Sequence, residues 1–330
     1  MSDLALAAFA AETGAHIVER PQDERFRRFE RNFDHQAFRA SLGAAGFRFV
    51  GRSEEHFPPL LRELHDPPPG LFLRGSAEPE LLSRPAVAIV GARSCSSYGF
   101  QVSRLLGREL AAAGLVVVSG LARGVDGEAH RGALEAGGTT VAVLGCGIDR
   151  DYPAAHAQLA RGICEGGLLA SEYAPGVEPA PWRFPARNRI IAGLAAATVI
   201  VEARERSGAL ITADFALEAG REVFAVPGEI TSRLAAGTNA LLKLGAAPLT
   251  APRDVLDHLG LEPPAPTRPD LSPVAAGVLK ALADEPAGAD ELGRATGLDA
   301  AAVAAALAEL ELVGAVAEAE GLYRGVRPPE

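Results

Sequence analysis

The stretch that decides the fold runs from Val116 to His130 and reads Val-Val-Val-Ser-Gly-Leu-Ala-Arg-Gly-Val-Asp-Gly-Glu-Ala-His. Three consecutive valines are typical of a buried parallel strand, because β-branched side chains pack well inside a covered sheet. Small residues that let a ligand approach the backbone follow, namely Ser119, Gly120 and Gly124. Asp126 stands where a helix N-cap is expected, and Arg123 adds a positive charge beside it. Since the amides at a helix start favour an anion, the stretch predicts a phosphate-binding turn.

The same strand-turn-helix pattern repeats along the middle of the chain. Apolar runs rich in β-branched residues predict strands at 87–90, 116–118, 141–144, 168–170, 198–201 and 223–226. Helix-compatible spacing falls between and after them, at 98–113, 126–136, 153–164, 187–196, 209–219 and 237–244. This alternation predicts an α/β fold with a doubly wound, mostly parallel sheet. Ligands of such sheets bind beyond the carboxyl ends of the strands.

The composition bounds the class of protein. With 330 residues, of which 48% are hydrophobic, the chain is long enough for two or three domains. It has no apolar run of membrane-spanning length and no signal-peptide pattern, so we expect a cytoplasmic protein without membrane insertion. The cysteines are odd in number and lack metal-ligand spacing, so we expect free thiols at Cys95, Cys146 and Cys164.

The sequence divides into four parts. Residues 1–80 form an N-terminal helical region with a predicted helix at 4–12 and a Pro-rich, extended lead-in at 57–75. Residues 81–260 hold the α/β pattern, and 261–272 form a Pro-rich linker. Residues 273–330 predict a winged helix, with helices at 273–283, 289–296 and 300–312 and strands at 313–318 and 322–325.

The distribution of charge limits where a nucleic acid could bind. The net charge is −10, residues 81–260 carry 17 basic and 17 acidic residues, and residues 261–330 carry 5 basic and 12 acidic residues. A backbone-binding site should therefore be a local arginine cluster in the middle domain. The predicted recognition helix at 300–312 contains no arginine or lysine, which favours protein contact over reading of a DNA groove.

Arginines interleave with phenylalanines near the N-terminus. The basic residues are Arg25, Arg27, Arg28 and Arg31, and the aromatic residues are Phe26, Phe29 and Phe33. Such a pattern is compatible with single-strand binding by base stacking. It is also typical of an amphipathic face with phenylalanines in a core and arginines in solvent. This second interpretation is favoured, because amphipathic faces are common.

Four groups of loop residues should meet at the carboxyl edge of the sheet. They are Gly91 to Ser94, Ser119 to Asp126, Gly145 to Pro153, and the pair formed by Phe184 to Arg189 with Arg206 to Thr212. Together they supply backbone amides, hydroxyls and arginines, the components of a phosphodiester site. Structural alternatives stay open, since the glycines could serve sharp turns, Arg187 and Arg189 could form ion pairs, and Asn188 could cap a helix.

The sequence shows no sign of a cofactor, a metal or a catalytic group. It lacks the Gly-x-Gly-x-x-Gly fingerprint and the P-loop motif, which disfavours dinucleotides and nucleoside triphosphates. His130 and His156 fall in predicted helices without ligand spacing. Glu172 and Asp214 form no paired-carboxylate motif, and Ser207 has no evident histidine partner. The pattern indicates anion binding without catalysis.

Several of these blocks resemble the signature blocks of the DNA processing protein A (DprA/Smf) family. They are Gly91-Ala92-Arg93, Ser119 to Asp126, Phe184 to Ala192, Arg206 to Thr212, Val226-Pro227-Gly228 and Gly237-Thr238-Asn239. The resemblance covers about residues 57–260 and keeps the family's order along the chain. It implies a Rossmann-like domain that forms a homodimer and a protein without enzymatic activity. The implied function is to bind and protect incoming single-stranded DNA in natural transformation and to load a RecA-type recombinase onto it.

The resemblance also implies which residues contact DNA. They are Gly91, Arg93, Ser119, Gly120, Arg123, Gly124, Asn188, Arg189, Gly208 and Thr212. The sequence departs from the family in two places. Ala154 follows Tyr152-Pro153 where some relatives have a basic residue, which Arg150 or Arg161 could replace. Residues 1–45 lack a clear helix-hairpin-helix pattern, so a sterile-alpha-motif-like domain there is reduced, divergent or absent.

Two alternative functions remain at this stage. One is a nucleotide-processing enzyme of the phosphoribohydrolase type, whose Pro-Gly-Gly-x-Gly-Thr-x-x-Glu motif is similar in layout. The corresponding residues here, Ser207 to Asp214, lack its glutamate, which disfavours that reading. The other is a winged-helix transcription regulator, which the acidic C-terminus disfavours.

Overall fold

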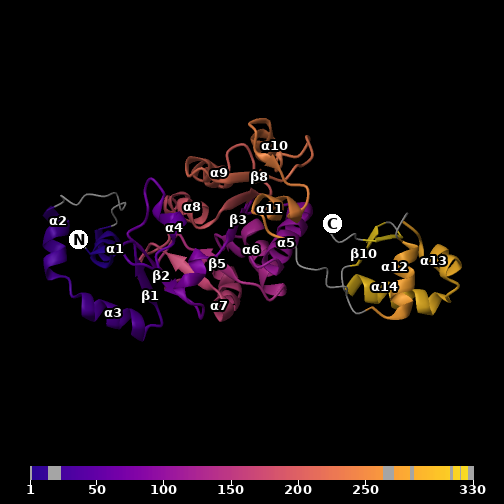
Figure 1. The fold of residues 1–330 in the computed structure, drawn as a ribbon, viewed down its shortest axis with the longest axis horizontal. Coiled ribbons are helices and arrows are strands. Elements are labelled where there is room, and N and C mark those ends of the chain that lie inside the picture. Colours follow the sequence, from indigo (N-terminus) through magenta and orange to yellow (C-terminus); the bar gives the residue numbers. More distant parts are fainter. Residues whose placement is uncertain are drawn as a thin grey trace. The chain divides into compact units, whose positions relative to one another are not determined.

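The chain is described here from a computed structural model, which covers residues 2–13, 24–262, 271–282, 286–312, 315–319 and 321–325. It consists of two compact units, Met1–Glu262 and Pro263–Glu330. Figure 1 shows the ribbon of both units, and the buried side chains form a separate hydrophobic core in each. Most of the predicted linker at 261–272 lies outside the described residues.

The first unit is built on a nine-stranded sheet with the order β1-β2-β6-β5-β4-β3-β7-β8-β9. The strands are β1 (Arg48–Gly51), β2 (Gly70–Arg74), β3 (Ala86–Val90), β4 (Val116–Ser119), β5 (Thr140–Val143), β6 (Leu168–Ser171), β7 (Ala197–Ile200), β8 (Glu222–Ala225) and β9 (Ala247–Pro248). In this order, the seven strands from β6 through β3 to β9 are parallel to one another, whereas β2 runs antiparallel to β6 and to β1. The doubly wound, mostly parallel sheet is therefore confirmed.

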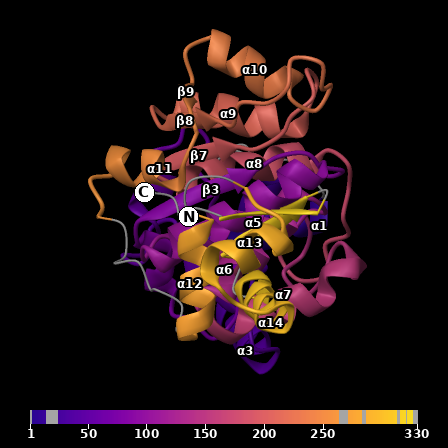
Figure 2. The ribbon, with the colours of Figure 1, turned by 90° about the vertical axis from the view of Figure 1, so that its right-hand side faces the viewer.

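Helices cover both faces of this sheet. They are α1 (Asp3–Thr13), α2 (Glu24–Asn32), α3 (His35–Ala44), α4 (Pro59–Arg62), α5 (Ser97–Ala112), α6 (Val125–Glu135), α7 (Ala157–Gly166), α8 (Arg183–Leu194), α9 (Gly208–Glu218), α10 (Ala236–Lys243) and α11 (Pro252–His258), with short 3-10 helices η1 (Pro79–Ser83) and η2 (Ala154–His156). In Figure 2, α8 and α9 lie on one side of the parallel strands and α5 and α6 on the other.

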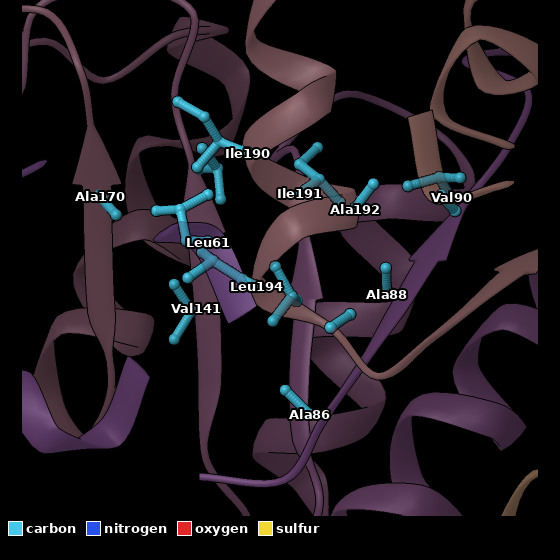
Figure 3. Close-up of a cluster of buried hydrophobic side chains, with 14 of the residues drawn as sticks. Leu61, Ala86, Ala88, Val90, Val141, Ala170, Ile190, Ile191, Ala192 and Leu194 are labelled. Atoms are coloured by element: carbon cyan, nitrogen blue, oxygen red, sulfur yellow. The ribbon is translucent and has the colours of Figure 1, made fainter. Parts of the chain in front are cut away.

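The two faces have separate cores because side chains alternate along each strand. Ala88 and Val90 of β3 pack with Ile190 of α8 on one face (Figure 3). Val87 and Ile89 of the same strand pack with residues of α5 and α6 on the other. Burial on both faces explains why these strands appear in the sequence as continuous apolar runs.

The sequence did not predict the antiparallel strands β1 and β2. The apolar residues of β2 are fully buried between β1 and β6, with Phe72 opposite Phe49 on one side and Ser171 on the other. Three prolines precede this strand, so the segment reads locally as an extended lead-in. Its position in the sheet depends on pairing with residues about a hundred positions later.

The phenylalanines of the N-terminal helices pack as an amphipathic face. Phe26 of α2 is buried against Ala5 and Leu6 of α1, and the rings of Phe29 and Phe33 lie 5.3 Å apart. The arginines of α2 are exposed, namely Arg25, Arg27, Arg28 and Arg31. The rings therefore serve packing within this helical region.

The second unit is a winged helix. It contains α12 (Pro273–Ala281), α13 (Ala289–Thr296), α14 (Ala300–Leu312) and an antiparallel hairpin of β10 (Val316–Ala319) and β11 (Leu322–Gly325). Its core joins Val278, Leu292, Val303 and Leu307. The predicted first strand began at Val313, which lies outside the described residues.

Two glycines set the close packing of α5 on α6. A Cβ atom on Gly107 of α5 would lie 2.2 Å from the Ala129 carbonyl oxygen, and one on Gly132 of α6 would lie 2.1 Å from the Arg104 carbonyl oxygen. Such contacts are far shorter than van der Waals distance. The two helices can therefore approach only where both residues lack side chains.

Replacing Gly107 with alanine should lower the free energy of unfolding by about 1–3 kcal/mol, because the new methyl group forces the helices apart. Urea denaturation followed by circular dichroism measures the change. Gly43→Ala in α3 is the matched control, since nothing lies within 4 Å of a Cβ there. Equal stability of the two variants would contradict the packing argument.

Candidate nucleic-acid interface

A pocket of about 230 Å³ opens at the carboxyl ends of the central strands. The chain runs outward from β3 to β6 on one side and then returns to place β7 beside β3, which makes this edge the switch point of the sheet. Predicted site residues that line the pocket are Gly91, Arg93, Asn188, Gly208 and Thr212. Three of the four predicted loop groups therefore meet there, after β3, after β4, and at the starts of α8 and α9.

Arg93 presents an available cation at the mouth of this pocket. Its side chain is exposed, and its guanidinium lies 5.4 Å from the centroid of the Phe184 ring, within cation-π range. No hydrogen bond or ion pair joins the guanidinium to another residue within the described part of the chain. Gly91 lets this loop leave β3, because a Cβ atom would lie 2.7 Å from Val125 Cγ2. The loop after β3 therefore exposes the Arg93 guanidinium, which can bind an anion.

The start of α9 supplies donors opposite this charge. Ser207 is the N-cap, and its Oγ accepts a hydrogen bond of 3.3 Å from the Ala209 amide. Asn188 Nδ2 donates to the Gly208 carbonyl at 3.0 Å and so fixes this turn against α8. Thr212 is only 1% exposed, and its hydroxyl makes no hydrogen bond to any described residue. The dipole of α9 and the unpartnered Thr212 hydroxyl favour an anion here.

Asp126 is not the N-cap that the sequence predicts. The helix α6 begins one residue earlier, with Gly124 as N-cap at a φ of 73°, so Asp126 falls in the first turn. Its Oδ2 accepts a hydrogen bond of 3.4 Å from the Ala122 amide. Burial raises the pKa of this carboxyl, while the nearby Arg187 opposes that shift. The amides of the loop after β4 therefore face the chain's own carboxylate.

Arg187 lines the pocket but is absent from the predicted DNA contacts, and in the sequence it stood out only as a member of its loop and as an ion-pair partner. Its side chain is buried, and Nη1 donates to the carbonyl oxygens of Gly120, at 2.9 Å, and of Val143. Burial lowers the pKa of Arg187 to about 10, which leaves the guanidinium charged at neutral pH. The local sequence Arg187-Asn188-Arg189 does not indicate which of the two arginine side chains lies beneath the pocket. Arg187 thus joins the ends of β4 and β5 beneath the pocket.

Arg189 turns away from the pocket. Its Nη1 and Nη2 donate to Glu172 at 2.9 and 2.7 Å, and its Nε donates to the Asp66 carbonyl at 3.0 Å. Burial opposes the charge, but Glu172 raises the pKa of Arg189 above its usual range. This arginine holds the lead-in segment against α8 and β6, and its predicted DNA contact stays untested.

The remaining predicted contacts lie in the loop after β4. Ser119 is fully buried, and its hydroxyl donates to the Ile89 carbonyl at 2.6 Å. Gly120 is buried against Arg187, since a Cβ atom would lie 2.6 Å from Nη2. Arg123 is exposed, and Gly124 packs on the backbone of Arg93. These residues shape the loop, and their contacts with DNA stay predictions.

The predicted third loop lies behind the pocket wall. A Cβ atom on Gly145 would lie 2.8 Å from the Phe184 ring, and Tyr152 packs on that ring at 5.3 Å between centroids. Ala154 is exposed, and Arg150 pairs with Glu178 at 2.6 Å. This loop therefore supports Phe184 and does not line the pocket.

The two histidines singled out in the sequence are buried. His130 Nδ1 lies 2.7 Å from Thr140 Oγ1, and the Thr140 hydroxyl donates to the Val117 carbonyl at 2.6 Å. Burial lowers the pKa of His130 to about 3, so it is neutral at physiological pH. His156 Nδ1 lies 2.9 Å from the Leu121 carbonyl oxygen. Across the described ranges, no group of three His, Cys, Asp or Glu side chains could hold a metal ion.

Comparisons with known proteins give the family. The model of DNA recombination-mediator protein A matches residues 48–260, and that of the DprA winged helix domain matches residues 262–321. Protein Smf of Escherichia coli is 41% identical over 290 residues, covering 84% of this chain and 77% of the relative. In the part of the chain that the structure describes, no helix is long and apolar enough to cross a membrane.

Two solved structures are similar over most of this chain. DNA processing protein A from Streptococcus pneumoniae has a TM-score of 0.66 at 36% identity, covering 79% of this chain and 93% of that one. The protein of the same name from Helicobacter pylori, described with a unique single-stranded DNA binding mode, has a TM-score of 0.58 at 32% identity, covering 64% and 95%. The chain therefore belongs to the DNA recombination-mediator protein A family, also called DNA processing protein A.

Proposed function

We propose that the pocket holds the sugar-phosphate backbone of single-stranded DNA. The observation that carries this proposal is that Arg93, the start of α9 and Thr212 line one pocket, while neither the Arg93 guanidinium nor the Thr212 hydroxyl has a hydrogen-bond partner among the described residues. A phosphate is the ligand that this set of groups suits, since it accepts hydrogen bonds from guanidinium, hydroxyl and helix amides alike. The Helicobacter pylori relative, whose solved structure concerns single-stranded DNA binding, supports the same ligand.

The wider role follows from family membership. We infer that the protein binds incoming DNA during natural transformation, protects it and loads a RecA-type recombinase onto it. A homodimer through the first unit and a cytoplasmic location belong to the same proposal. We also infer that the second unit contacts protein, because α14 carries Glu309 and Glu311 and no basic residue.

The pocket supports binding without chemistry. Asp126 is its one carboxylate among the described lining residues, and this group is held between Arg187 and the Ala122 amide. Hydrolysis of a glycosidic bond calls for a carboxylate free to act as acid, base or nucleophile. We therefore propose a non-enzymatic protein, and release of free base from a nucleoside monophosphate would overturn this view.

Replacing Arg93 with alanine should weaken single-strand binding at least tenfold, because a charge-assisted hydrogen bond is worth about 1.5–3 kcal/mol. The slope of log K against log salt should fall by about 0.7 for the lost phosphate contact. Fluorescence anisotropy over a salt series measures both quantities. Arg253→Ala is the control, since Arg253 is exposed on α11 and pairs with Asp257. An unchanged slope in the Arg93 variant would remove this residue from the site.

Replacing Thr212 with valine should weaken binding about three- to tenfold and leave stability nearly unchanged, because the hydroxyl has no described protein partner to lose. Thr198→Val is a matched control. Thr198 is also fully buried with an unpartnered hydroxyl, but it lies within β7 and away from the pocket. If both variants bind DNA as the natural chain does, the Thr212 hydroxyl is not a DNA contact.

Replacing Arg189 with methionine should cost about 3–5 kcal/mol of stability, because Glu172 is left as an unpaired buried charge. Adding Glu172→Leu should recover most of this loss. Urea denaturation measures stability, and anisotropy under native conditions measures binding. Full stability together with lost binding would instead make Arg189 a DNA contact.

A further inference from the structure

Leu121 adopts an unusual backbone conformation in the loop after β4. Its φ is 59°, and it is the one non-glycine residue with positive φ among those the structure describes. A branched side chain in this region is strained, so surrounding contacts must hold it there. The side chain is fully buried in the core with Leu144 and Ile148. This burial anchors the residue but leaves the direction of its carbonyl to be set by another contact.

His156 supplies that contact. Its Nδ1 lies 2.9 Å from the Leu121 carbonyl oxygen, and since a carbonyl accepts, Nδ1 carries the proton. The histidine is itself held at the end of η2, where its amide donates to the Pro153 carbonyl at 2.8 Å. Gly127 of α6 leaves room for the ring, because a Cβ atom there would lie 2.7 Å from His156 Cε1.

Each neighbouring carbonyl of the loop is also held from outside it. Arg187 donates to the Gly120 carbonyl at 2.9 Å, and the Gly127 amide donates to the Ala122 carbonyl at 3.1 Å. The carbonyl and N–H of a trans peptide point in opposite directions. The bond from His156 to the Leu121 carbonyl therefore also sets the direction of the Ala122 N–H, which meets Asp126 in the pocket.

The loop in turn supports the backbone of Arg93. The Val125 amide donates to the Ala92 carbonyl at 3.2 Å. A Cβ atom on Gly124 would lie 2.2 Å from that carbonyl oxygen and 2.8 Å from the Arg93 carbonyl carbon. The loop after β3 thus rests directly on the loop after β4. A change in the path of one loop must shift the other.

We propose that His156 is a positioning residue for single-strand binding, acting through the Leu121 carbonyl on the loop that seats Arg93. His156 is not among the residues that line the pocket, and its Nδ1 contacts the Leu121 carbonyl oxygen. The inference rests on the proposed DNA-binding function. The role of the His156 imidazole is to donate one hydrogen bond to the Leu121 carbonyl, and not merely to fill space.

The test compares His156→Asn with His156→Leu in the full chain. The amide nitrogen of asparagine can replace Nδ1 as donor, whereas leucine fills the volume better but cannot donate. Anisotropy with a labelled thymidine oligonucleotide should show binding about tenfold weaker for the leucine variant and within about twofold of the natural chain for the asparagine variant. A role in packing alone predicts the reverse order, which would overturn the proposal, as would equal binding by all three chains.

A second pair of variants keeps the test valid if His156→Leu fails to fold. Gly127→Ala favours the helix α6 but pushes on the imidazole, and should weaken binding in the same direction. Gly162→Ala in α7 is the control, because the nearest atom to its Cβ lies at an ordinary 3.5 Å. Natural binding by Gly127→Ala would overturn the role of His156. Failure of the unsubstituted chain to bind single strands would instead overturn the proposed function.

Discussion

The pocket depends on the buried guanidinium of Arg187. It donates to backbone carbonyls at the ends of β4 and β5, and the Asp126 carboxylate lies beside it. A buried cation is costly unless its charge is compensated, and here the carbonyl hydrogen bonds and the electrostatic attraction of the Asp126 carboxylate provide that compensation. Gly120 is required between the two charges, since a Cβ atom would lie 2.6 Å from each of them. This cluster ties α8, α6 and two strand ends together at the switch point.

The cluster gives the two sides of the pocket different tasks. On one side, backbone groups of the loop after β4 form hydrogen bonds with Asp126, Arg187 and His156. On the other, Arg93 and the start of α9 keep donors that meet no described partner. The first side therefore fixes the backbone path of the loop after β4, and the second side exposes the charge of Arg93. Leu121, with its positive φ, belongs to the same loop as Gly124, which contacts the loop after β3.

Much of the fold follows from local pattern. Six of the seven parallel strands in the described sheet, all but the two-residue β9, were predictable because burial on both faces requires continuous apolar runs. Strand β2 was not, since its place between β1 and β6 comes from pairing over long separation. The start of α6 was displaced by one residue because Gly124 takes the left-handed conformation that ends the loop. Local rules thus predict elements better than their edges.

By itself, the sequence determined the order of the central strands and helices, the edge of the sheet at which the pocket opens, and the blocks that mark the family. It could not distinguish Arg93, Arg187 and Arg189, which carry the same charge and fall in neighbouring blocks. Only the tertiary structure decided that the first is exposed, the second holds backbone carbonyls, and the third pairs with Glu172. The reason is physical. Desolvation and pairing, which give an arginine its role, come from elements far apart in the chain and are absent from any local pattern.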